Sequence, residues 1–151
     1  MSGATPGRQQ WRALLETVVE SVEEFGPQEL QELKRRWHQL FGGGQQPFLW
    51  HCFSFRLHPH LTGAPAVADY EAQPVRAFLV FFEQAAWGFR CRGVRLPPWP
   101  LLRELSSQGP PEGRDVYVTQ PTLNWVFCQT HEAGFGPYFA RADPASTAGM
   151  A

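Results

Sequence analysis

A chain of 151 residues with a formal net charge of −1 fits a single globular domain, and its composition, 43% hydrophobic and 14% aromatic, excludes a disordered body. The near-neutral charge disfavours nucleic-acid binding through a broad basic surface. No run approaches the roughly 18 apolar residues of a membrane span, and the first ten residues lack a secretion signal, so we expect a cytoplasmic protein with no membrane association.

The N-terminal part predicts a disordered stretch over residues 1–7 and then an amphipathic helix. Apolar residues recur at steps of three and four from Trp11 to Phe25, which is the stripe of a helix that faces a core. The other side of this helix carries an acidic face, formed by Glu16, Glu20, Glu23 and Glu24. Such a face is either a solvated surface or a docking face for a basic partner.

A second helix and a buried strand follow. Gly26 and Pro27 separate the first helix from a second one that reaches Phe41, so the two form a helical hairpin. The run over 48–57 is apolar on both alternating faces, and it predicts a strand inside a sheet. His51 lies within this strand.

The middle of the chain predicts short helices and a β-hairpin. The expected elements are a helix over 67–72, a hairpin of strands 77–82 and 87–94, helical turns over 101–105 and a strand over 115–119. Arg90, Arg92 and Arg95 follow one another along the second hairpin strand. They indicate either a solvated sheet face or an anion site, and nucleic-acid binding through them ranks last among the functions.

Residues 124–139 read as a strand, a polar turn and a returning strand. Trp125 and His131 share one face of the first strand, and Gly134, Gly136 and Pro137 suit a sharp return. Trp125 and Tyr138 are expected to hold the turn as buried rings with polar handles. Glu132 is expected at the exposed tip of the turn.

The order of these elements predicts an α+β fold. An N-terminal helical hairpin would pack on a mostly antiparallel sheet of five or six strands, with the helices mainly on one face. The domain would span residues 8–141, and the small polar tail over 142–151 would be disordered.

Few constellations in the chain suit chemistry. Cys52, Cys91 and Cys128 each lie in an apolar run, which predicts buried reduced thiols. Cys128 and His131 point to opposite faces of a regular strand and cannot form a nucleophile and base. His51 and His131 would meet if their strands are neighbours. With Glu132 or Asp115 they could then bind a metal or act as acid and base, although hydrogen-bonded structural histidines are the preferred interpretation.

Several short motifs resemble the YxiF-like bacterial proteins of unknown function. The matching pieces keep one order over residues 48–141: Leu49-Trp50-His51, Phe53-Ser54, Asp115-Val116-Tyr117-Val118, Trp125, Thr130-His131-Glu132 and Gly136-Pro137-Tyr138-Phe139. The family's turn usually carries one more residue, often a cysteine, where this chain has Ala133-Gly134-Phe135. The resemblance implies a small accessory protein, in a setting similar to that of toxin-immunity proteins.

From these observations we predict a non-enzymatic, cytoplasmic protein-binding domain without a cofactor or metal. Its partner would be a protein, and an immunity-type protein that neutralises a toxin by direct binding is the specific form that the resemblance suggests. The candidate binding residues are His131, Glu132, Tyr138, Trp125, His51, Glu20 and Glu24. The alternative is a small metal-dependent or acid/base enzyme centred on His51, His131 and Glu132.

Overall fold

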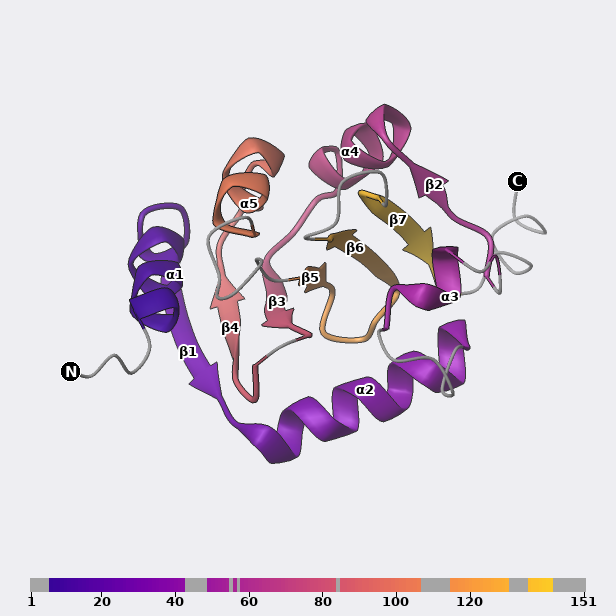
Figure 1. The fold of residues 1–151 in the computed structure, drawn as a ribbon. Helices are drawn as coiled ribbons and strands as arrows, with labels where there is room; N and C mark the ends of the chain where they lie inside the picture. Colours follow the sequence, from indigo (N-terminus) through magenta and orange to yellow (C-terminus); the bar gives the residue numbers. More distant parts are fainter. Residues whose placement is uncertain are drawn as a thin grey trace.

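A computed structural model of the chain describes residues 6–42, 49–54, 56, 58–83, 85–106, 115–130 and 136–142. The helices are α1 (Pro6–Glu16), α2 (Pro27–Phe41), α3 (His51–Ser54), α4 (Ala64–Glu71) and α5 (Trp99–Ser106) (Figure 1). The strands are β1 (Ser21–Phe25), β2 (Leu61–Thr62), β3 (Ala77–Phe82), β4 (Gly88–Arg92), β5 (Val116–Thr119), β6 (Trp125–Gln129) and β7 (Tyr138–Arg141). The predicted disordered ends fall mainly on 1–5 and 143–151, outside the described residues.

The described strands form one sheet of seven, in the order β1-β4-β3-β5-β6-β7-β2. Every pair of neighbours is antiparallel. The predicted α+β class with an antiparallel sheet is therefore confirmed, although the sheet has more strands than the five or six expected. The two extra strands are β1 and the short β2, which lie at the opposite edges of the sheet.

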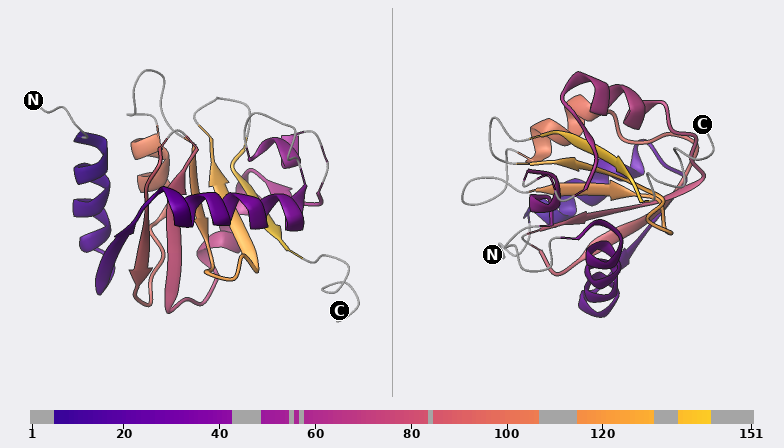
Figure 2. Two further views of the ribbon diagram at one scale, coloured as in Figure 1. Left: turned by 90° about the horizontal axis from the view of Figure 1, so that it is seen from below. Right: turned by 90° about the vertical axis from the view of Figure 1, so that its right-hand side faces the viewer.

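Helices cover both faces of the sheet. Buried side chains of α2 and α3 join one apolar cluster with Phe81 and Tyr117, while those of α1, α4 and α5 join another with Phe78 and Val80. The left view of Figure 2 shows α2 crossing in front of the strands, and Figure 1 shows α4 and α5 on the side of the sheet away from α2. The expected helical hairpin is not formed, because β1 separates α1 from α2 and the two helices pack on opposite faces.

The helix predicted from Trp11 to Phe25 ends nine residues earlier than expected, at Glu16. The helix α1 ends at Glu16, and residues 21–25 pair with β4, so that Ser21 lies opposite Arg92 and Phe25 opposite Gly88. The β-branched run Thr17-Val18-Val19 disfavours helix, and backbone pairing at the sheet edge decides the structure of the residues that follow. The prediction of an acidic helix face is therefore wrong, because Glu23 and Glu24 lie on a strand and point to its opposite faces.

The strand predicted over 48–57 is also wrong. Residues 51–54 form the helix α3, and Leu49 and Trp50 lie in the turn before it, while Phe48, Phe55 and Leu57 lie outside the described residues. A run that is apolar on all sides shows that a segment is buried, but it does not distinguish a strand from a short buried helix. Leu49, Trp50, Cys52 and Phe53 are indeed all at most 3% exposed.

The other predicted elements are found close to their expected positions. The helix α2, the β3–β4 hairpin, β5, β6 and β7 match the predicted segments, and α4 and α5 are slightly longer than expected. Cys52, Cys91 and Cys128 are buried free thiols, as predicted. Among the described residues, none of the helices combines the length and the apolar character that crossing a membrane requires.

Candidate functional site

A polar row interrupts the apolar face of the sheet beneath α2. Glu83 follows β3, Asp115 precedes β5 and Thr130 follows β6, and each lies two residues beyond a side chain of the core cluster on that face. The Glu83 amide donates to the Asp115 carbonyl oxygen over 3.0 Å, which continues the ladder between β3 and β5. Asp115 is fully buried and Thr130 is 3% exposed. Polar side chains therefore meet at the end of three neighbouring strands.

Glu83 lies at one end of this row and connects it to neighbouring elements. One oxygen of its carboxylate, Oε1, accepts hydrogen bonds from the Leu49 amide over 2.7 Å and from the Tyr117 hydroxyl over 2.5 Å. The other oxygen, Oε2, lies 4.0 Å from Nζ of Lys34 on α2. The Glu83 side chain is only 9% exposed. Glu83 thus connects the sheet to α2 and to the segment that leads into α3, and it acts as a structural latch.

The groups around this latch are held in their neutral forms. Burial raises the pKa of the Tyr117 hydroxyl and of the Cys128 thiol well above their ordinary values. Burial also raises the pKa of the Cys52 thiol to about 12. A thiol with so high a pKa supplies almost no thiolate near neutral pH, so these cysteines are not nucleophiles in the folded protein.

The predicted binding residues around the polar turn do not form one site in the described structure. His51 begins α3 rather than lying on a strand, and its ring contacts that of Trp50. Trp125 packs against Phe139 on one face of the sheet, whereas Tyr138 packs against Trp50 on the other. His131 and Glu132 lie outside the described residues. The placement of His51 on a strand, on which its expected meeting with His131 rested, is therefore wrong.

In the described part of the chain, no three His, Cys, Asp or Glu side chains are placed so that they could hold one metal ion.

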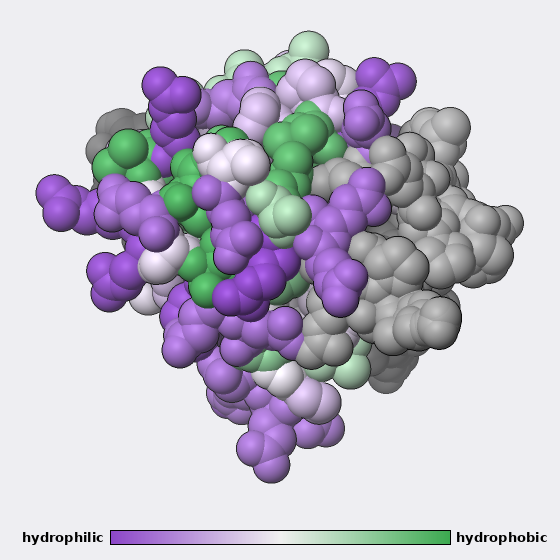
Figure 3. All heavy atoms as spheres, turned by 90° about the vertical axis from the view of Figure 1, so that its left-hand side faces the viewer, coloured by the Kyte–Doolittle hydropathy of each residue, from purple (hydrophilic) through white to green (hydrophobic). Residues whose placement is uncertain are grey.

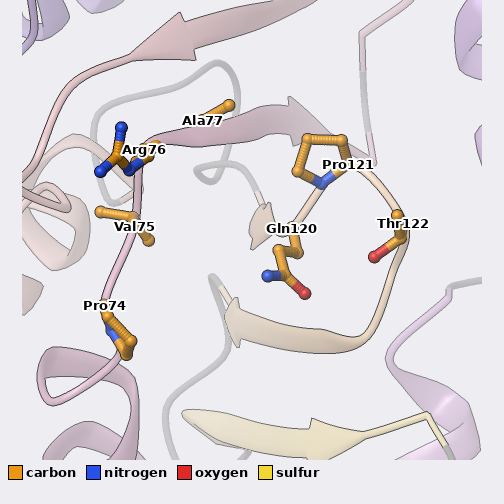
Figure 4. A pocket seen from close by; sticks show the side chains of 7 residues that line it. All are labelled: Pro74, Val75, Arg76, Ala77, Gln120, Pro121 and Thr122. Carbon is orange, nitrogen blue, oxygen red and sulfur yellow. The ribbon is translucent and has the colours of Figure 1, made fainter.

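Three surface hollows lie side by side at the opposite end of the sheet. The first, of about 440 Å³, lies between residues 74–77 at the start of β3 and residues 120–122 in the β5–β6 turn. Figure 4 shows these two walls, with Val75 and Gln120 on opposite sides. The second, of about 350 Å³, is lined by Val18, Glu71, Gln73, Val94, Arg95, Leu96 and Pro98. The third, of about 300 Å³, is lined by Glu20, Val75, Arg76, Arg92, Gly93 and Val94.

Shared residues join the hollows into one groove, which we call the strand-end groove. Val94 lines both the second and the third hollow, and Val75 and Arg76 line both the first and the third. Val94 is 73% exposed, the highest value among the exposed large hydrophobic residues. Seen from the side of α1 and β1, Figure 3 shows apolar residues gathered between polar ones. An exposed apolar side chain between hollows is a typical feature of a recognition surface.

One wall of the groove is held by a strained turn. Leu123 has a φ of 60°, a conformation that costs a residue other than glycine about 1–2 kcal/mol. Its side chain is fully buried, and its amide donates to the Gln120 carbonyl oxygen over 2.8 Å. Arg36 of α2 also donates to the Pro121 carbonyl oxygen, over 3.4 Å. Burial of Leu123 offsets the strain, so the wall formed by residues 120–122 is fixed before any ligand binds.

The groove contains some of the residues that the sequence analysis singled out. Glu20 lines it, with its amide bonded to the Arg92 carbonyl oxygen over 2.7 Å, and Arg92 and Arg95 line it as well. Glu24 lies on β1 but does not line any of the three hollows. Arg90 is engaged elsewhere, because it pairs with Glu23 over 3.3 Å and with Glu29, and its hydrogen bond to Glu29 raises its pKa.

The other residues of the polar row and of the strand-end groove were not identified from the sequence. Glu83 and Lys34 were not singled out, because nothing in the local pattern brings them together. The groove combines residues 18–20, 71–77, 92–98 and 120–122, which only the sheet topology unites. Val94 was the available signal, since it is a large apolar residue directly after Arg92 and Gly93 at the end of a strand.

Comparison with known proteins gives a family and no further relative. The family model described as "Domain of unknown function (DUF4275)" matches residues 8–139. No curated protein and no solved structure matches the chain.

Proposed function

The chain belongs to this family of domains of unknown function, and from its geometry we propose that it is a protein-binding domain that uses the strand-end groove. The observation that carries the proposal is Val94, which is 73% exposed and lies where two of the three hollows meet. Exposing a valine to water is unfavourable, and covering it with a partner would recover roughly 25 cal/mol for each Å² that is buried.

The walls of the groove suit binding more than chemistry. Pro74, Pro121 and Pro98 restrict three of the lining segments, and the buried Leu123 fixes the turn. A wall that is ordered before binding loses little conformational entropy when a partner docks, which favours affinity. At the other end of the sheet the Glu83 carboxylate is engaged in the structure itself and the thiols are buried, so the proposed binding uses none of them.

A more specific version of this proposal is that the domain is an immunity-type protein. A protein that neutralises a toxin by direct binding needs a surface of complementary shape and charge, and it needs no chemistry of its own. The resemblance to small accessory proteins supports this role, and the groove supplies a surface for it. Loss of growth protection on altering Val94, in cells that express the bound partner, is the observation that would assign the role.

A charge placed at Val94 is expected to weaken partner binding. The partner is captured from the organism that encodes the domain and then purified, and its dissociation constant is measured for the native chain and for Val94→Asp. Because the substitution replaces an apolar contact at the centre of the interface with a carboxylate that must be desolvated there, we expect affinity to fall at least about tenfold.

The matched control is Leu40→Asp, because Leu40 is also an exposed large apolar residue, at 39% exposure, and lies on α2 outside the three hollows. This variant should bind like the native chain, and both variants should keep the native circular-dichroism spectrum. Equal binding by native protein and Val94→Asp would remove the groove from the proposed function.

A further inference from the structure

We infer that the strand-end groove takes an extended, acidic segment of its partner, with carboxylate side chains paired to Arg76, Arg92 and Arg95 and apolar side chains placed against Val94 and Val75. This inference rests on the protein-binding function proposed above. It adds the chemistry of the bound segment.

The first argument is the state of the arginines. Of the described residues, no carboxylate lies within ion-pair distance of Arg76, Arg92 or Arg95, and all three side chains are exposed. Three arginines outside the groove are paired with carboxylates: Arg12 with Glu16, Arg35 with Glu32, and Arg90 with Glu23 and Glu29. Arg36 donates to a backbone carbonyl, and Arg103 and Arg141 lie over aromatic rings. The guanidinium groups around the groove thus remain available to carboxylates of a partner.

The second argument is the charge balance inside the groove. Three arginines face two carboxylates, those of Glu20 and Glu71, and Glu71 already accepts a hydrogen bond from the Trp99 amide over 3.1 Å. The groove is therefore locally positive in a chain whose formal net charge is −1. Such an inversion of charge favours an acidic ligand and disfavours a basic one.

The third argument is the shape of the surface. The three hollows form a row because neighbouring hollows share Val94, Val75 and Arg76. An extended peptide sends successive side chains to opposite sides, so it can place carboxylates toward the arginines and apolar groups toward the valines. A compact ligand would fill one hollow and leave the others empty.

These observations favour an acidic peptide over a nucleic acid. A phosphate backbone needs a wide basic surface, whereas Arg90 is neutralised by Glu23 and Glu29, and Glu20 lies among the groove arginines. The apolar Val94 at the centre would also contact a phosphate backbone unfavourably. An alternating acidic and apolar peptide satisfies both the arginines and Val94.

The test uses fluorescein-labelled synthetic peptides and the full chain, with binding followed by fluorescence anisotropy. The probe alternates aspartate with leucine or valine, and matched peptides carry asparagine or lysine at the aspartate positions. We expect the acidic peptide to bind at least tenfold more tightly than the asparagine peptide and to weaken as salt rises from about 50 to 300 mM. The lysine peptide should not bind.

Charge-reversal variants of the chain are expected to change the affinity for the acidic peptide in a direction that depends on the position. Arg76→Glu and Arg92→Glu should each weaken the acidic peptide at least tenfold, and Glu20→Lys should tighten its binding severalfold. The control Arg35→Glu reverses a charge on the exposed surface of α2, outside the three hollows, and should leave the affinity unchanged.

Three outcomes would overturn the inference. They are equal binding of the acidic and asparagine peptides, unchanged affinity of both arginine variants, or displacement of the acidic peptide by a single-stranded oligonucleotide that binds more tightly than it does. If a purified protein partner still depends on Val94 while acidic peptides fail, the chemistry assigned to the segment is wrong and the protein-binding function stands. If Val94→Asp leaves that partner bound, the proposed function itself fails.

Discussion

Replacing Trp37 with alanine is expected to lower the free energy of unfolding by about 3–5 kcal/mol, the largest loss from any single substitution considered for this domain. Trp37 lies on the buried side of α2 and is completely shielded from solvent. Its ring contacts those of Phe41 and Tyr117 at centroid distances of 5.1 Å and that of Phe53 at 5.9 Å. Alanine would leave a cavity between the helix and the sheet that these rings cannot fill by small movements.

Urea unfolding followed by far-ultraviolet circular dichroism measures this loss without depending on tryptophan fluorescence. Leu40→Ala on the same helix is the control, because Leu40 is 39% exposed and should cost less than about 1 kcal/mol. Trp37→Phe, which keeps a ring at the site, should fall between the two and remains measurable if the alanine variant does not fold. Equal stability of Trp37→Ala and Leu40→Ala would contradict the placement of α2 on the sheet.

The second large effect is expected at the latch. Glu83→Ala removes the acceptor of both the Leu49 amide and the Tyr117 hydroxyl, and it leaves Lys34 without its carboxylate. Tyr117 is fully buried, so its hydroxyl cannot turn to water instead. We expect a loss of about 3 kcal/mol, in the range found when a buried charged partner is deleted.

Two companion variants separate the latch from a general effect of charge. Glu83→Gln keeps an oxygen acceptor and should lose less stability than Glu83→Ala. Glu32→Ala removes an exposed carboxylate that pairs with Arg35 on α2, and it should change stability by less than about 0.5 kcal/mol. If Glu83→Ala and Glu32→Ala are equally stable, Glu83 does not hold α2 and the 49–54 segment on the sheet.

Strong local periodicity made part of the fold predictable. Pro27 to Phe41 carries a helical stripe bounded by Gly26 and Gly42, and the helix has these limits. Residues 77–82 and 88–92 alternate or are apolar throughout and are separated by a short turn, and they form the expected hairpin. In such segments the local preference and the tertiary structure agree, so the sequence pattern suffices.

Two segments could not be predicted because tertiary pairing decided them. In residues 17–25 the apolar positions fit a helical stripe, but β4 offers an unpaired edge to which Ser21–Phe25 can bond. Residues 49–54 are buried on every side, and the Leu49 amide is anchored by Glu83, a residue 34 positions away. Neither the edge nor the anchor is visible in the local pattern.

The candidate site was predictable only in fragments. Glu20, Arg92 and Arg95 were singled out from charge alone. Glu20 was assigned to a helix that in fact ends at Glu16, on a face that was either a solvated surface or a docking face for a basic partner. The strand-end groove requires the start of β3, the end of β4 and the β5–β6 turn to lie at one end of the sheet. That arrangement reverses the expected chemistry, because it surrounds Glu20 with arginines.

The central claim is that the strand-end groove contacts another protein, and a photo-crosslinking residue tests it most directly. A benzophenone-bearing amino acid is introduced at Val94 and, in a separate variant, at Gln39, which is exposed on α2. After irradiation in cells of the organism that encodes the domain, we predict one defined adduct from position 94 that a soluble acidic peptide suppresses, and none from position 39. The same adducts from both positions, or none from position 94, would contradict the assignment of the groove as the binding surface.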